Sequence, residues 1–198
     1  MTLFKKRYRI ESPRLPGKDY TDNGIYFVTI CTRGGEHVFG EIQNGVMCLS
    51  ETGTAIAEEW RRTEQLRYYV TLDRWVIMPN HMHAIIVMQR NPTIDFMLSA
   101  NHRTYVRMIN DPPVSVETRR RRVSPRHRHW KPHSLGSIIN QFKTACTKRI
   151  HAMGYGDFSW QRQFYDHIIR NDESLFHIRH YIRDNPQKWG CEKMIKTP

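Results

Sequence analysis

VTLDRWVIMPNHMHAIIVMQ, residues 70–89, is the stretch on which the fold prediction rests. Its two halves, 70–78 and 81–89, are rich in β-branched and other apolar side chains, which is typical of strands. Between them lie Pro79 and Asn80, residue types that favour turns. The stretch therefore predicts two neighbouring strands that pair through a tight turn.

Strand and helix patterns alternate along the rest of the chain. Aromatic and β-branched residues predict a strand over 25–32, and Asn44-Gly45 between two short apolar runs predicts a hairpin over 36–50. A further short strand is expected within 158–170. Strands that neighbour each other in sequence in this way favour an antiparallel sheet.

Apolar residues at helical spacing predict three helices. They cover about 51–68, Ser134 to Gly154, and 172–185. The expected N-caps are Ser50, Ser134 and either Asn171 or Asp172, and Pro186 is expected to stop the last helix. This element order predicts an α+β sandwich, in which an antiparallel sheet carries its helices on one face.

Composition narrows the class of protein. The chain has 198 residues with 31 Lys or Arg and 19 Asp or Glu, a net charge of +12 with histidine neutral. Aromatic residues make up 11%, which excludes a disordered chain, and no apolar run approaches the roughly 20 residues of a membrane span. The charge favours a nucleic-acid partner, and a basic protein with a solvated charged face is the alternative. With no signal peptide visible, the expected location is the cytoplasm, in association with the nucleoid.

The segment 91–133 interrupts the pattern of strands and helices. It lacks apolar periodicity and contains five prolines, which is typical of an insertion or a long loop. It also carries the densest basic run of the chain, which predicts contacts with DNA phosphates. The basic residues of this run are Arg119, Arg120, Arg121, Arg122, Arg126, Arg128 and Lys131.

The strand at 81–89 begins with two histidines, His81 and His83. Alternate residues of a strand project from the same face, about 7 Å apart. Two neutral imidazoles in this arrangement could form half of a divalent-metal site. The alternative is a pair of surface histidines in a chain that contains 11 of them.

The last helix places Tyr181 and Asn185 one turn apart on one stripe. A tyrosine hydroxyl can act as a nucleophile, and the amide oxygen of Asn185 could complete a metal site. Alternatively, Tyr181 packs at the rim of the core and Asn185 ends the helix before Pro186.

Residues 160–166, WQRQFYD, mix aromatic, amide and basic side chains. Trp160, Gln161 and Arg162 suit contacts with nucleic-acid bases and phosphates. Equally, Trp160 and Phe164 could seal one end of the core. Lys143 and Lys148, expected on the outward side of the preceding helix, extend the candidate DNA-binding set.

Three motifs together resemble one known family. These are VIMPNHMHA (76–84), which resembles the histidine–hydrophobic–histidine (HUH) motif, WQRQFYD (160–166) and YIRDNP (181–186). They resemble, in order and spacing, the signatures of the REP-associated tyrosine transposases, the single-tyrosine branch of the HUH endonucleases. The resemblance covers about residues 24–90 and 134–190, and the insertion at 91–133 departs from it.

This resemblance implies a ferredoxin-like (RRM-like) fold and a DNA-processing activity. In this family the equivalents of His81, His83 and Asn185 would hold Mg²⁺ or Mn²⁺, and Tyr181 would be the nucleophile, with Tyr165 as a weaker candidate. The implied substrate is single-stranded hairpin DNA of the kind formed by REP elements of bacterial genomes, cleaved and rejoined through a 5′-phosphotyrosine. The alternative is a regulator on the same fold that binds DNA or RNA hairpins without cleaving them.

The expected organisation is one main domain over 25–190. A polar arm at 1–24 precedes it, the basic insertion at about 91–133 interrupts it, and a tail at 191–198 follows it. The protein is expected to act as a monomer or homodimer.

Overall fold

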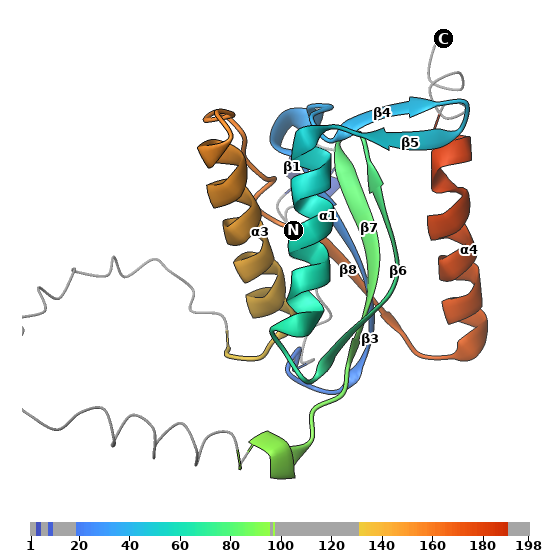
Figure 1. Ribbon diagram of the computed structural model, residues 1–198. Coiled ribbons are helices and arrows are strands. Elements are labelled where there is room, and N and C mark those ends of the chain that lie inside the picture. The colour runs from blue at the N-terminus through green and yellow to red at the C-terminus, as the bar shows by residue number, and fades with distance from the viewer. Residues whose placement is uncertain (1–2, 5–7, 10–18, 96, 98–130, 190–198) are drawn as a thin grey trace, which may run out of the picture.

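Four antiparallel strands form the central sheet (Figure 1). In the computed structural model, which describes residues 3–4, 8–9, 19–95, 97 and 131–189, their order across the sheet is β6-β7-β3-β8. The strands are β3 (Gly24–Cys31), β6 (Val70–Met78), β7 (His81–Met88) and β8 (Tyr165–Ile169). A two-residue pair, β1 (Leu3–Phe4) and β2 (Tyr8–Arg9), lies outside this sheet.

Three long helices accompany the strands. They are α1 (Glu51–Gln65), α3 (Leu135–Ala152) and α4 (Asp172–Lys188). The order β3-α1-β6-β7-α3-β8 joins two split β-α-β units, and the first and third of these strands lie at the centre of the sheet. This is the ferredoxin-like arrangement, so the predicted fold class is confirmed.

The predicted caps begin all three helices. Ser50 Oγ accepts a hydrogen bond from the Gly53 amide at 3.1 Å, and Ser134 Oγ accepts one from Ser137 at 3.2 Å. For α4 the cap is Asn171, whose Oδ1 accepts from the Ser174 amide at 2.8 Å. Each bond satisfies an amide of the first turn that has no partner within the helix.

Helices cover both faces of the sheet, so the prediction of helices on one face is wrong. On one face, α1 and α3 pack side by side over Val28 and Ile86, and Trp60 and Phe142 meet with ring centroids 4.8 Å apart. On the other, α4 packs over a smaller apolar cluster (Figure 1). This cluster comprises Phe27, Ile85, Ile169 and Ile182, with Ile25, Val76, Leu175 and Ile178 at its margin. The strands are apolar on both faces, and each face requires a cover.

The last helix also continues past Pro186, which was expected to stop it. It ends at Lys188, and the Trp189 amide still donates to Asn185 O at 3.1 Å. Because Pro186 lies in the final turn, it removes one backbone hydrogen bond but leaves the helix on either side intact. Burial of Ile182 before it and contact of the Trp189 ring with His81 after it hold this turn against the sheet.

The predicted hairpin comprises β4 (Gly40–Gln43) and β5 (Val46–Leu49). At its tip, Asn44 and Gly45 both have positive φ, 50° and 77°, as a two-residue hairpin turn of this kind requires. The hairpin leads directly into α1.

Gly53 in the first turn of α1 lies against the backbone that enters this hairpin. A Cβ at this position would lie 2.0 Å from Phe39 O. We therefore expect Gly53→Ala to lower the free energy of unfolding by about 1–3 kcal/mol, although alanine is the better helix former. Urea unfolding followed by circular dichroism measures the change. Gly156→Ala, where a Cβ meets open space, is the matched control, and equal effects of the two substitutions would contradict the packing argument.

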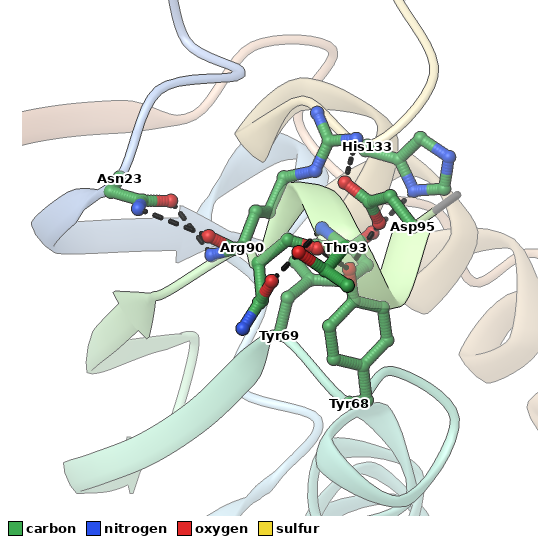
Figure 2. Close-up of polar contacts among 8 residues, drawn as sticks. Asn23, Tyr68, Tyr69, Arg90, Thr93, Asp95 and His133 are labelled. Carbon is green, nitrogen blue, oxygen red and sulfur yellow. Dashed lines mark hydrogen bonds and ion pairs between the residues drawn. The ribbon is translucent and has the colours of Figure 1, made fainter. Parts of the chain in front are cut away.

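A polar cluster joins the end of β7 to the start of α3 (Figure 2). Arg90 forms an ion pair with Asp95, Tyr68 donates to Asp95, and His133 Nδ1 lies 3.2 Å from the Tyr69 hydroxyl. The described chain on both sides of 98–130 is thereby fixed at one end of the sheet. His81 begins β7 at the other end, seven residues or about 23 Å from Met88.

Candidate active site

The two histidines of β7 lie side by side on the face that α4 covers. Their Nε2 atoms are 3.0 Å apart, and their rings meet edge to face with centroids separated by 4.6 Å. The expectation that His81 and His83 project from the same face is therefore confirmed. Met82 and Ala84 point into the opposite core and have no exposed surface.

Each histidine has a hydrogen-bond partner on its other ring nitrogen. His81 Nδ1 lies 2.7 Å from Asn80 Oδ1, and His83 Nδ1 lies 2.9 Å from Thr29 Oγ1. The Asn80 amide is oriented by its Nδ2, which donates to Gly35 O at 3.0 Å. His81 Nδ1 therefore carries the proton and donates to Asn80, which leaves the lone pair of His81 on Nε2.

Both imidazoles are neutral at pH 7. Burial lowers the pKa of His81 to about 4, and nearby His37 adds to the shift. Burial likewise lowers the pKa of His83 to about 3, with His81 contributing. Desolvation disfavours the protonated ring, and a neutral imidazole is the form that binds a metal ion.

Tyr181 of α4 reaches the same point from the other side. Its hydroxyl lies 3.3 Å from His83 Nε2, and its ring meets Phe27 edge to face at 6.1 Å. The residue is 44% exposed. Tyr165, the weaker candidate, is half exposed on β8 and also contacts Phe27, with ring centroids 6.4 Å apart.

Asn185 lies between two anchored positions of α4. One turn before it, Tyr181 contacts His83, and one turn after it, Trp189 contacts His81 with ring centroids 5.5 Å apart. Because residues four apart share a helix face, the buried Asn185 belongs to the face that passes over the histidine pair. The structure thus brings His81, His83 and Tyr181 together, and Asn185 follows one turn after Tyr181 on the same face of α4.

The donor set fits a divalent ion. Adjacent ligands of an octahedral ion with bonds of about 2.1 Å lie about 3.0 Å apart, which matches the separation of the two Nε2 atoms. Two imidazoles and an amide oxygen are acceptable ligands for Mn²⁺ and softer than Mg²⁺ prefers. Among the residues that the structure describes, no group of three or more His, Cys, Asp or Glu gathers as a metal site. The amide oxygen of Asn185 is the predicted third ligand.

We expect Asn80→Ala to weaken Mn²⁺ binding about 10- to 100-fold, because the substitution removes the acceptor that orients His81. Isothermal titration of the protein with MnCl₂, without DNA, measures the effect. Asn140→Ala, at an exposed position of α3, is the matched control. Unchanged affinity in Asn80→Ala would show that the Asn80–His81 hydrogen bond does not position the ring.

The predicted residues Trp160, Gln161 and Arg162 lie beside the histidines. They line an open cavity of about 870 Å³ that also borders His81, Asn80 and Trp189. Trp160 packs against Phe39 and Phe158 with ring centroids 5.4 and 5.3 Å away, so it also seals the core as the alternative interpretation proposed.

The predicted lysines occupy different surroundings. Lys143 Nζ donates to Gln161 O at 2.8 Å, and burial lowers its pKa to about 8. Lys148 is exposed and lines a second cavity of about 340 Å³, which shares residues 159–162 with the first. Lys131 pairs with Asp19 at 2.8 Å near the start of α3, away from the histidines. Arg119, Arg120, Arg121, Arg122, Arg126 and Arg128 lie outside the described residues.

A protein of Haemophilus influenzae Rd, described only as uncharacterized, is 30% identical to this chain over 183 residues. The match covers 92% of this chain and 91% of the relative. The chain belongs to the family of this protein. No family model matches the chain.

Solved structures identify the fold. A REP-associated tyrosine transposase bound to a REP hairpin matches 89% of this chain and 74% of its own, with a TM-score of 0.52 and 18% identity. The resemblance to this group is therefore confirmed at the level of the fold. A protein of Deinococcus radiodurans R1 with a provisional assignment as a transposase matches 86% of this chain and 97% of its own, with 12% identity and a TM-score of 0.42.

Several residues of the site were not anticipated from the sequence. They are Thr29 and Asn80 beside the histidines, Phe27 beneath Tyr181, and Arg33 and Trp189 at the cavity. Strand alternation in the sequence could have shown that Thr29 and Val28 lie on opposite faces of β3. The position of Thr29 opposite both His83 and Tyr165 depends on the strand register, which the sequence pattern does not reveal. Within the described residues, no helix is long and apolar enough to cross a bilayer.

Proposed function

We propose that this protein is a metal-dependent strand transferase that cleaves and rejoins single-stranded hairpin DNA through Tyr181. The observation that carries the proposal is the position of the Tyr181 hydroxyl, 3.3 Å from His83 Nε2 and above a pair of neutral, oriented imidazoles. A nucleophile beside a metal-binding donor pair is the arrangement that phosphoryl transfer requires. The structural neighbour bound to a REP hairpin supports the choice of hairpin DNA.

The chain's own residues have separate tasks in this reaction. Asn80 and Thr29 orient the rings of His81 and His83 through Nδ1, so that both Nε2 atoms are directed to one point. His81, His83 and Asn185 would hold Mg²⁺ or Mn²⁺. When bound, the ion supplies positive charge to a non-bridging oxygen of the scissile phosphate. Phe27 and the helix α4 hold the Tyr181 ring so that its hydroxyl lies beside His83 Nε2.

Tyr181 Oη then attacks phosphorus. The Oη–P bond forms, the bond from phosphorus to the 3′-oxygen breaks, and the proton of the tyrosine is ultimately balanced on the released 3′-hydroxyl. The number of phosphoester bonds is unchanged, so a 3′-hydroxyl can attack the 5′-phosphotyrosine and rejoin the strands without an external energy source.

The decisive experiment is to incubate the protein with a labelled single-stranded hairpin and MnCl₂, then to separate the products on a denaturing gel. The proposal predicts a covalent protein–DNA adduct whose modified peptide contains Tyr181. Binding of the hairpin with no adduct under Mg²⁺ or Mn²⁺ would favour the alternative of a hairpin-binding regulator. A matched blunt duplex is the substrate control, and it should give no adduct.

A further inference from the structure

The cavity beside His81 is built from three loops that the sheet brings together. Its lining comes from residues 31–35 at the end of β3, from Asn80 and His81 at the turn before β7, and from residues 159–162 before β8, with Trp189 at one side. Its volume of about 870 Å³ is within the range of sites for small organic ligands. Because His81 is part of the lining, the cavity adjoins the point at which the two histidines and Tyr181 meet.

Backbone hydrogen bonds hold these loops in place without a ligand. The Arg33 amide donates to Ser159 O, and the Gln161 amide donates to Cys31 O, both at 2.9 Å. The Thr32 amide donates to Asn80 O at 2.9 Å. Because the backbone is already paired, the cavity is preformed, and a ligand would meet side chains whose loops need not rearrange.

The charge of the lining favours an anion. Arg33 and Arg162 both line the cavity, and its lining contains no Asp or Glu. Neither guanidinium has an ion-pair partner in the described part of the chain, whereas Arg149 and Arg179 are both paired with carboxylates. Two exposed and unpaired guanidinium groups at one cavity are suited to phosphate.

The cavity also presents aromatic surface. The indoles of Trp160 and Trp189 both line it, and Trp189 lies at the boundary with His81. The Nε1 of Trp160 is buried and has no hydrogen-bond partner among the described residues. Aromatic side chains beside cationic groups are the usual way in which proteins bind unstacked nucleotides.

We propose that this cavity holds an unpaired nucleotide immediately next to the scissile phosphate. The base lies against the indoles, and its backbone phosphate lies between Arg33 and Arg162. This inference rests on the proposed function, since it takes the scissile phosphate to lie at His81 and His83. The second cavity, past Arg162 and lined by Lys148, continues the path of the same strand across residues 159–162.

The test measures DNA binding without catalysis. Full-length Tyr181→Phe protein is titrated, with EDTA present, against a fluorescein-labelled oligothymidylate of about 12 nucleotides over a range of salt concentrations. Arg33→Ala/Arg162→Ala is expected to weaken binding at least about 10-fold and to reduce the salt slope by about 1.4, or 0.7 for each lost phosphate contact. Arg61→Ala/Arg74→Ala, which removes equal charge outside the cavity, should leave the slope unchanged.

A second measurement locates the strand directly. The oligothymidylate is made with 4-thiothymidine, irradiated, and the cross-linked peptides are identified by mass spectrometry. Cross-links to the peptides that contain Trp160 or Trp189 support the proposal. Cross-links confined to other peptides, an unchanged salt slope in the cavity variant, or equal competition by a blunt duplex would each overturn it.

The result is independent of the proposed chemistry. Metal is removed and Tyr181 lacks its hydroxyl, so the binding assay does not require adduct formation. If the wild-type protein forms no adduct but the cavity variant loses affinity for the oligonucleotide, the nucleotide site is supported and the strand-transferase proposal is rejected. If the wild-type protein forms an adduct but the cavity variant binds the oligonucleotide as tightly as its parent, the strand-transferase proposal is supported and the nucleotide site is rejected.

Discussion

Tyr181→Phe should reduce formation of the covalent protein–DNA adduct by at least about 10³-fold, because the substitution removes the oxygen that we propose attacks the phosphate. The ring contacts with Phe27 and His83, at 6.1 and 5.2 Å, do not involve the hydroxyl and are retained. The free energy of unfolding should change by less than about 0.5 kcal/mol, since the side chain is 44% exposed. A denaturing gel with a labelled hairpin and Mn²⁺ measures the adduct, and urea unfolding measures stability.

Tyr165→Phe is the matched control for this experiment. Both tyrosines are about half exposed, and both contact Phe27. The hydroxyl that contacts His83 belongs to Tyr181. Tyr165→Phe should therefore retain the adduct. If Tyr165→Phe loses the adduct and Tyr181→Phe retains it, the assignment of the nucleophile is wrong, although the metal site could still stand.

His81→Ala should weaken Mn²⁺ binding by more than about 100-fold and abolish the adduct, because it removes one of the two proposed nitrogen ligands, whose Nε2 atoms lie 3.0 Å apart. Calorimetric titration with MnCl₂ measures affinity, and oligonucleotide binding in EDTA should be little changed. Since burial lowers the pKa of His81 and His83 to about 4 and 3, protons should not compete with the metal at these rings above about pH 5.

His37→Ala is the control for His81→Ala. His37 also contacts Trp189, with ring centroids 5.8 Å apart, and it is exposed, but it is not a predicted ligand. The His37→Ala protein should bind Mn²⁺ with the same affinity as the unmodified protein. Equal affinity in the two variants would place any bound metal away from the histidine pair.

Local patterns were enough to predict much of the fold and part of the site. The apolar runs around Pro79-Asn80 predicted β6 and β7, and the capping residues Ser50 and Ser134 predicted where α1 and α3 begin. Strand alternation alone placed His81 and His83 on one face. These signals depend on neighbours in sequence, so one chain is sufficient to detect them.

The remaining features depend on residues far apart in sequence. Thr29 meets His83 only because β3 pairs with β7 in one register, and a shift by one residue would turn the Thr29 side chain to the other face. Helix α4 lies on the second face because both faces of the sheet are apolar. The sequence patterns predicted the strands but not which face each helix would cover. Pro186 was misjudged because a proline in the final turn costs only one backbone hydrogen bond.

The polar cluster around Arg90 and Asp95 has a consequence for how this fold can diverge. It fixes both described flanks of 98–130 at the end of the sheet opposite His81, so the length of chain between them is not coupled to the geometry of the histidines. Each doubling of such a connection costs only about 0.6 kcal/mol of closure entropy. We therefore expect that this connection can be lengthened or shortened without moving His81 and His83.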